Sequence, residues 1–142
     1  MRRLSLVIGV LSPLVIGATD YPPAPAHVHA GPIETEIKQI FEANCGKYGQ
    51  YTVSLVISPS QEVRLEGISR DKTSFSSASM SQVNDQLVRM KNYKYSYVRC
   101  SEVGLNVVIL SGQPSMANDL SAIQFIAMNG TIAGIRIPPI HQ

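Results

Sequence analysis

Three tyrosines alternate along one apolar segment, and their spacing points to recognition more directly than any other motif in the chain. Tyr93, Tyr95 and Tyr97 are separated by single residues, and alternate residues of a β-strand point to the same face of its sheet. Aromatic rings in such a row offer a large contact area at little entropic cost. Two other arrangements fit the same spacing, because the row could line the core of a curved sheet or be interrupted by a β-bulge. The sequence therefore offers these tyrosines as a candidate binding surface, although the spacing alone favours a core role slightly over a surface one.

The three histidines disfavour hydrolytic chemistry. His27 and His29 lie in a proline-rich segment, and His141 is the penultimate residue. The predicted core therefore holds no histidine that could act as a general base for a serine or cysteine nucleophile. Two imidazoles, at His27 and His29, are too few ligands for a durable metal site. We expect no catalytic residue, no metal site and no cofactor, and the balance is against an enzyme.

Two glutamates are the best candidates for a carboxylate pair. Glu62 and Glu66 are four residues apart with Arg64 between them, so in a strand all three would share one face. Their Cβ atoms would then be roughly 13 Å apart. This separation exceeds that of glycosidase carboxylates, so the sequence predicts a solvated sheet face.

The first residues have the layout of a secretory signal peptide. Arg2 and Arg3 precede a mostly apolar run from Leu4 to Ile16, and Ala18 is a suitable cleavage residue. The run is shorter than the roughly 20 residues that a membrane span requires. We expect residues 1–18 to be removed and the chain to be secreted or periplasmic, with no stable membrane insertion after cleavage. A retained anchor is the alternative.

The charge of the whole chain follows largely from this leader. The chain has 12 Lys and Arg residues against 10 Asp and Glu residues, a formal net charge of +2. Residues 1–18 contain Arg2 and Arg3 and no acid, so the remaining chain is formally neutral. It has no basic tract for nucleic acid or an anionic membrane surface. We therefore expect no nucleic-acid partner.

The two cysteines are expected to form a disulfide, because export places them in an oxidising compartment. A Cys45–Cys100 bond would close a loop of about 56 residues and stabilise the fold by roughly 4 kcal/mol on the chain-entropy model.

The remaining pattern predicts one domain behind a tether. Residues 19–31 are rich in proline and predict a flexible tether, and residues 32–142 predict a single α+β domain. Apolar residues at helical spacing predict a helix from Pro32 to Gly46 that carries Cys45 on its buried face. The positions with that spacing are Ile33, Ile37, Ile40 and Phe41.

A second helix and a set of strands follow from the same kind of reading. Alternating apolar residues predict a hairpin from Tyr51 to Leu65, and a helical stripe from Met80 to Met90 predicts the second helix. Four strands are expected after it, at Tyr93–Cys100, Leu105–Ser111, Leu120–Met128 and Thr131–Ile137. Asn129-Gly130 is a hairpin-turn dipeptide between the last two.

The element order α-β-β-α-β-β-β-β predicts an α+β fold with a mainly antiparallel sheet of about six strands and two helices on one side. The sequence does not select a biochemical role. The leading hypothesis is an exported small domain that binds a protein, as an accessory or inhibitor-like protein does. One alternative is a cone-shaped α+β domain that binds a small ligand or acts as an enzyme without a catalytic histidine. The other is a structural envelope protein.

Overall fold

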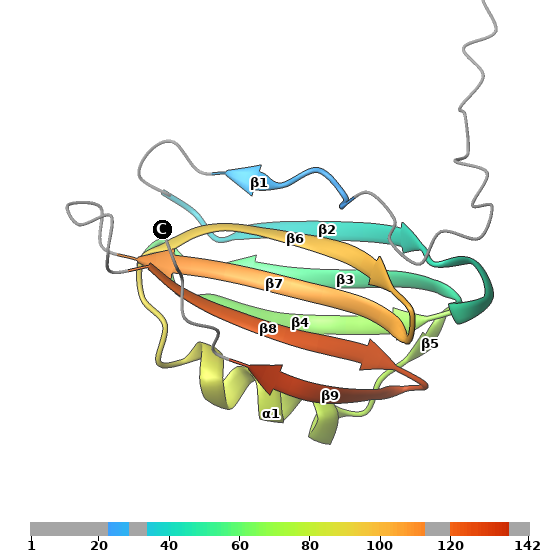
Figure 1. The fold of residues 1–142 in the computed structure, drawn as a ribbon. Coiled ribbons are helices and arrows are strands. Elements are labelled where there is room, and N and C mark those ends of the chain that lie inside the picture. Colours follow the sequence, from blue (N-terminus) through green and yellow to red (C-terminus); the bar gives the residue numbers. More distant parts are fainter. Residues whose placement is uncertain (1–22, 29–33, 113–119, 137–142) are drawn as a thin grey trace, which may run out of the picture.

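In the described part of the chain, two antiparallel β-sheets lie face to face, and one α-helix runs along one side of them (Figure 1). The structure is a computed structural model that describes residues 23–28, 34–112 and 120–136. Sheet I has the order β1-β6-β7-β8-β9, with strands at His27–Val28, Tyr93–Ser101, Gly104–Gly112, Leu120–Met128 and Thr131–Arg136. Sheet II has the order β2-β3-β4-β5, with strands at Ile37–Asn44, Gln50–Ile57, Val63–Arg70 and Thr73–Ser74. The helix α1 covers Ser77–Leu87, and a short 3-10 turn, η1, covers Gly46–Tyr48.

This architecture contradicts the predicted α+β fold with one sheet of about six strands and two helices. The sheets are two, and the described residues contain one α-helix. The first expected helix, from Pro32 to Gly46, is the main error, because Ile37–Asn44 forms strand β2 along the whole of β3.

The physical reason for the error lies in two residues of β2. Gln39 points between the sheets and is only 3% exposed, whereas Ile40 points outward and is 52% exposed. Strand β2 therefore places a polar residue inside and an apolar one outside, which breaks the alternation that identifies a strand. The apolar residues Ile37, Ile40 and Phe41 therefore have the spacing of a helical stripe, although in the strand they lie on both faces.

The other predicted elements match the structure closely. The hairpin is β3–β4, the second helix is α1, and the four C-terminal strands are β6 to β9. Asn129 and Gly130 both have positive φ angles, 47° and 78°. These angles are those of the type I′ turn expected between the last two strands.

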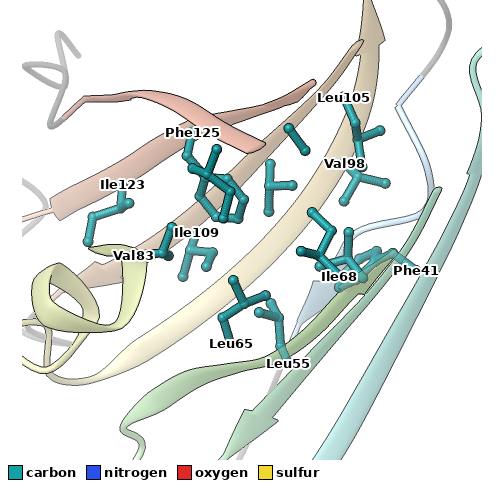
Figure 2. Packing of buried hydrophobic residues seen from close by; sticks show 14 of the residues in the cluster. Phe41, Leu55, Leu65, Ile68, Val83, Val98, Leu105, Ile109, Ile123 and Phe125 are labelled. Carbon is teal, nitrogen blue, oxygen red and sulfur yellow. The ribbon is translucent and has the colours of Figure 1, made fainter. Parts of the chain in front are cut away.

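The core lies between the inner faces of the two sheets (Figure 2). Sheet II contributes Phe41, Leu55, Leu65 and Ile68, and Val83 enters from α1. Sheet I contributes Val98, Leu105, Ile109, Ile123 and Phe125. Burial of this apolar surface is what holds two sheets together, at roughly 25 cal/mol per Å².

A disulfide joins the two sheets covalently at one end. Cys45, directly after β2, is bonded to Cys100 in β6, with the Cα atoms 5.4 Å apart. The predicted Cys45–Cys100 bond is confirmed, but it links sheet to sheet where a helix-to-sheet link was expected. Both residues are buried in the core.

Helix α1 closes the edge of sheet II beside β4. The side-chain carboxamide of Asn84 accepts a hydrogen bond from the Leu65 backbone N–H (2.8 Å) and donates one to the Leu65 carbonyl (3.0 Å). A neighbouring strand would bond to the N–H and C=O groups of Leu65 in the same way. The Asn84 side chain therefore takes the place of a strand at this position of the edge. This matters because an unpaired strand edge is a template for association with other chains.

The expected leader, residues 1–18, lies outside the described residues, as does most of the expected tether, residues 19–31. Its described part, residues 23–28, lies against β6: the backbone N–H of Ala24 donates to the carbonyl of Val98, and β1 pairs with Tyr95 and Ser96. Among the helices described, none has the length and apolar character needed to cross a membrane.

Candidate functional site

A β-bulge in β6 divides the three candidate tyrosines between the two faces of sheet I. Tyr93 pairs with Ser111, whereas Tyr95 pairs with Leu110, so Lys94 is an extra residue between them. The bulge turns Tyr93 towards the core and leaves Tyr95 and Tyr97 on the outer face. The expectation that all three tyrosines share one face is therefore wrong for Tyr93. The structure has the β-bulge that was considered as an alternative.

Tyr93 belongs to a buried polar cluster between β2 and β6. Its hydroxyl donates to the side-chain oxygen of Gln39 (2.8 Å) and lies 2.7 Å from the hydroxyl of Ser96. All three residues are almost fully buried. Burial raises the pKa of the Tyr93 hydroxyl above its ordinary value, and the hydrogen bonds with Ser96 and Gln39 oppose this only in part. Since the phenol stays neutral and hydrogen-bonded, the cluster fixes how the sheets align rather than offering a reactive group.

Tyr95 and Tyr97 lie next to each other on the outer face. Their ring centroids are 6.3 Å apart and the ring planes differ by 21°. The rings pack against a small apolar cluster of Val108, Leu110 and Ala122, which is separate from the main core. These three residues are buried although they face away from the sandwich.

The outer face is hollowed around these rings. A depression of about 340 Å³ is lined by Tyr95, Tyr97, Arg99, Asn106, Val108, Leu110, Ala122 and Gln124, and we call these eight residues the tyrosine face. They come from β6, β7 and β8, which lie side by side in Figure 1. The exposed lining is mostly polar, and the two aromatic rings lie over a buried apolar cluster. Aromatic rings among polar groups are typical of protein interfaces.

One polar atom in the depression lacks a partner among the described residues. The side-chain oxygen of Asn106 is buried and accepts no hydrogen bond there. A buried acceptor without a donor costs about 1–3 kcal/mol. Because this oxygen is closed off from solvent, a ligand N–H or O–H group would recover that free energy once the side chain turns outward to meet it.

The charges on sheet I have one sign. Its five strands contain Lys94, Arg99 and Arg136 and no acidic residue. Arg99 lines the tyrosine face, and Arg136 is opposite Gln124 in the neighbouring strand. Sheet II differs, because its strands carry Glu42 and Glu66 among their basic residues.

The remaining sequence candidates are not assembled into a site. Glu62 pairs with Lys91, whose hydrogen-bonded ammonium lowers the pKa of this carboxyl, and Glu66 pairs with Lys38. His27 lies in β1 with its ring edge-on to Phe41 at 4.8 Å, whereas His29 and His141 lie outside the described residues. Among the residues that the structure describes, no three His, Cys, Asp or Glu side chains gather as metal ligands would.

A second depression, of about 290 Å³, lies beside α1. Its floor is formed by Val56 and Val63, and Val88 stands at its side. It holds no aromatic side chain, and its acid Glu62 is already paired with Lys91. The tyrosine face is therefore the stronger candidate.

Sequence reasoning missed most of the tyrosine face, although β7 carried a signal for it. Val107, Val108, Ile109 and Leu110 are four consecutive apolar residues, and such a run indicates a strand that is apolar on both faces. Val107 and Ile109 fill the core, so Val108 and Leu110 have to form a second apolar surface. Asn106 and Gln124 had no comparable signal, since isolated carboxamides are common on strands.

No protein-family model, curated protein or solved structure matches this chain.

Proposed function

We propose that this chain is an exported domain that acts by binding a protein partner through the tyrosine face. The observation that carries the proposal is the second apolar cluster: Val108, Leu110 and Ala122 are buried beneath two neighbouring tyrosines on the outward side of a sheet. The core between the two sheets does not need these apolar residues, because they lie on the other side of sheet I.

The composition of the face supports a protein partner. Tyrosine and arginine are enriched at the energetic centres of protein interfaces, because they combine apolar area with hydrogen-bonding groups. Tyr95 and Tyr97 provide the area, and Arg99, Asn106 and Gln124 provide the polar groups around it. Export agrees with the Cys45–Cys100 bond, since such bonds persist in oxidising compartments.

A small-ligand site is the second candidate, and one observation favours it. The depression of about 340 Å³ lies at the lower end of the range of small-molecule sites, roughly 300–1,000 Å³. Its open, sheet-like form fits a surface contact better, because small ligands are usually enclosed on several sides.

Affinity capture from the host's envelope fraction tests the proposal. Purified protein is immobilised as the wild type, as Tyr97→Ser and as Tyr48→Ser, the last being the same chemical change in η1 of the other sheet. We expect one protein to be enriched by the wild type and by Tyr48→Ser but not by Tyr97→Ser. Failure to enrich any protein, or equal enrichment by all three forms, would count against the proposal. Thermal melts show whether each variant is folded.

A further inference from the structure

The charges around the tyrosine face indicate what kind of partner it takes. The strands of sheet I carry Lys94, Arg99 and Arg136 and no acid, and the nearest acid along the β6–β7 hairpin is Glu102, in the turn beyond both strands. The chain without its leader is formally neutral, so this concentration of one sign is a local property of sheet I. Complementary charge steers encounter and selects partners.

The depression adds two further requirements. The half-buried rings of Tyr95 and Tyr97, which lie over the buried cluster, offer apolar area to a partner. The oxygen of Asn106, which has no partner among the described residues, needs a hydrogen-bond donor. A phosphate ion can donate a hydrogen bond when it is protonated, but it has no apolar group to cover the rings. An acidic polysaccharide supplies donors and charge but no apolar side chain.

An acidic peptide meets all three requirements. Its carboxylates would face the basic residues, its backbone N–H groups would pair with Asn106, and an aliphatic or aromatic side chain would cover the rings of Tyr95 and Tyr97. The alternation of an extended segment suits this division, because successive side chains point to opposite sides and every second one could enter the depression. We propose, building on the function proposed above, that the tyrosine face binds an extended acidic segment of a partner protein that carries at least one large apolar residue.

Selection from a library of random short peptides tests this directly. The purified protein is the bait, and Tyr97→Ser serves as the counter-selection. We expect the enriched peptides to combine Asp or Glu with a large aliphatic or aromatic residue. Enrichment of neutral or basic peptides, or no enrichment beyond that of Tyr97→Ser, overturns the inference.

Charge reversal then measures the contribution of the basic residues with the enriched peptide as the probe. Arg136→Glu should weaken its binding by roughly tenfold, because a weak surface attraction is replaced by a repulsion of similar size. Arg64→Glu is the matched control, since Arg64 is exposed on a strand of sheet II, and it should leave the affinity unchanged. Raising the salt concentration from about 0.05 to about 0.3 M should weaken the wild type more than Arg136→Glu. If Arg136→Glu and Arg64→Glu lose peptide affinity equally, the inference is overturned.

Two outcomes separate this inference from the function on which it rests. If a protein is captured through Tyr97 but Arg136→Glu binds it as well as the wild type, the face binds proteins and the acidic preference is wrong. If polygalacturonate, an acidic polysaccharide, binds more tightly than any selected peptide and depends on Arg136, both the peptide and the protein-binding function are overturned.

Discussion

The pairing of Asn84 with the edge of β4 allows a stability effect to be predicted from geometry. Its carboxamide makes two hydrogen bonds to the backbone of Leu65, at 2.8 and 3.0 Å, in a partly buried position. Asn84→Ala removes both and leaves the N–H and C=O groups of Leu65 without a partner. Each bond contributes about 1 kcal/mol, and leaving the groups unpaired costs about 1 kcal/mol more. Alanine returns about 0.6 kcal/mol through its higher helix propensity. The free energy of unfolding should therefore fall by about 2 kcal/mol.

The assay is chemical denaturation at neutral pH, with a thermal melt alongside. For a domain of this size, a loss of about 2 kcal/mol corresponds to a fall in the melting temperature of about 6–10 °C. Asp85→Ala is the matched control, because Asp85 is the next residue of the same helix, is exposed and gains similarly in helix propensity. We expect it to be neutral or slightly stabilising.

The comparison of the two variants isolates the Leu65 contacts. If Asn84→Ala and Asp85→Ala differ by less than about 0.5 kcal/mol, the carboxamide does not replace a strand neighbour and the reasoning is refuted. Asn84→Asp provides a second check. Its carboxylate can still accept from the Leu65 N–H but repels the carbonyl, so this variant should be at least as unstable as alanine at neutral pH.

Three further predictions concern the tyrosines and the disulfide. Tyr95→Ser should lower the free energy of unfolding by no more than about 1.5 kcal/mol, because the ring covers only a small surface cluster; a loss of 3 kcal/mol or more in denaturation would assign Tyr95 to the core. Replacing Cys45 and Cys100 together by alanine should cost roughly 4 kcal/mol, and adding reductant to the wild type should reproduce the loss in a thermal melt. Because burial raises the folded-state pKa of Tyr93, its contribution is fully present below the unfolded pKa near 10 and is lost as the pH rises through the higher folded value. Denaturation at several alkaline pH values should show a shallower decline in Tyr93→Phe than in the wild type, and parallel declines would contradict this origin.

Much of the fold could be predicted from local patterns. The strands from Tyr93 onward are β-branched and apolar, and Asn129-Gly130 sets their last turn, so local preference and final structure agree. The number of sheets could not be read in the same way. Whether the nine described strands form one sheet or two depends on which apolar faces meet, and alternation along one strand does not contain that information.

The candidate site was predictable only in part, for a related reason. Tyr95 and Tyr97 were identified by their spacing, but their floor in β7 and β8 depends on pairing between strands that the sequence does not specify. The bulge at Lys94 is equally hidden. An extra residue in a strand moves the side chains before it to the opposite face of the sheet. No residue type near Lys94 marks the position of the bulge.

The two main errors have one physical origin, the polar cluster of Gln39, Tyr93 and Ser96. Gln39 made β2 resemble a helix, because a strand is recognised by apolar residues on its inner side. Tyr93 was grouped with the outer tyrosines because alternate residues of a regular strand share one face, whereas the bulge at Lys94 lets Tyr93 turn inward to the cluster. Each of these polar side chains can be buried because the other two form hydrogen bonds with it. A buried polar group without such partners would lower the stability of the fold. The cluster lies between β2 and β6, the strands that also approach the disulfide. It therefore holds Tyr93 inward, and this leaves Tyr95 and Tyr97 as the two tyrosines on the outer face of β6.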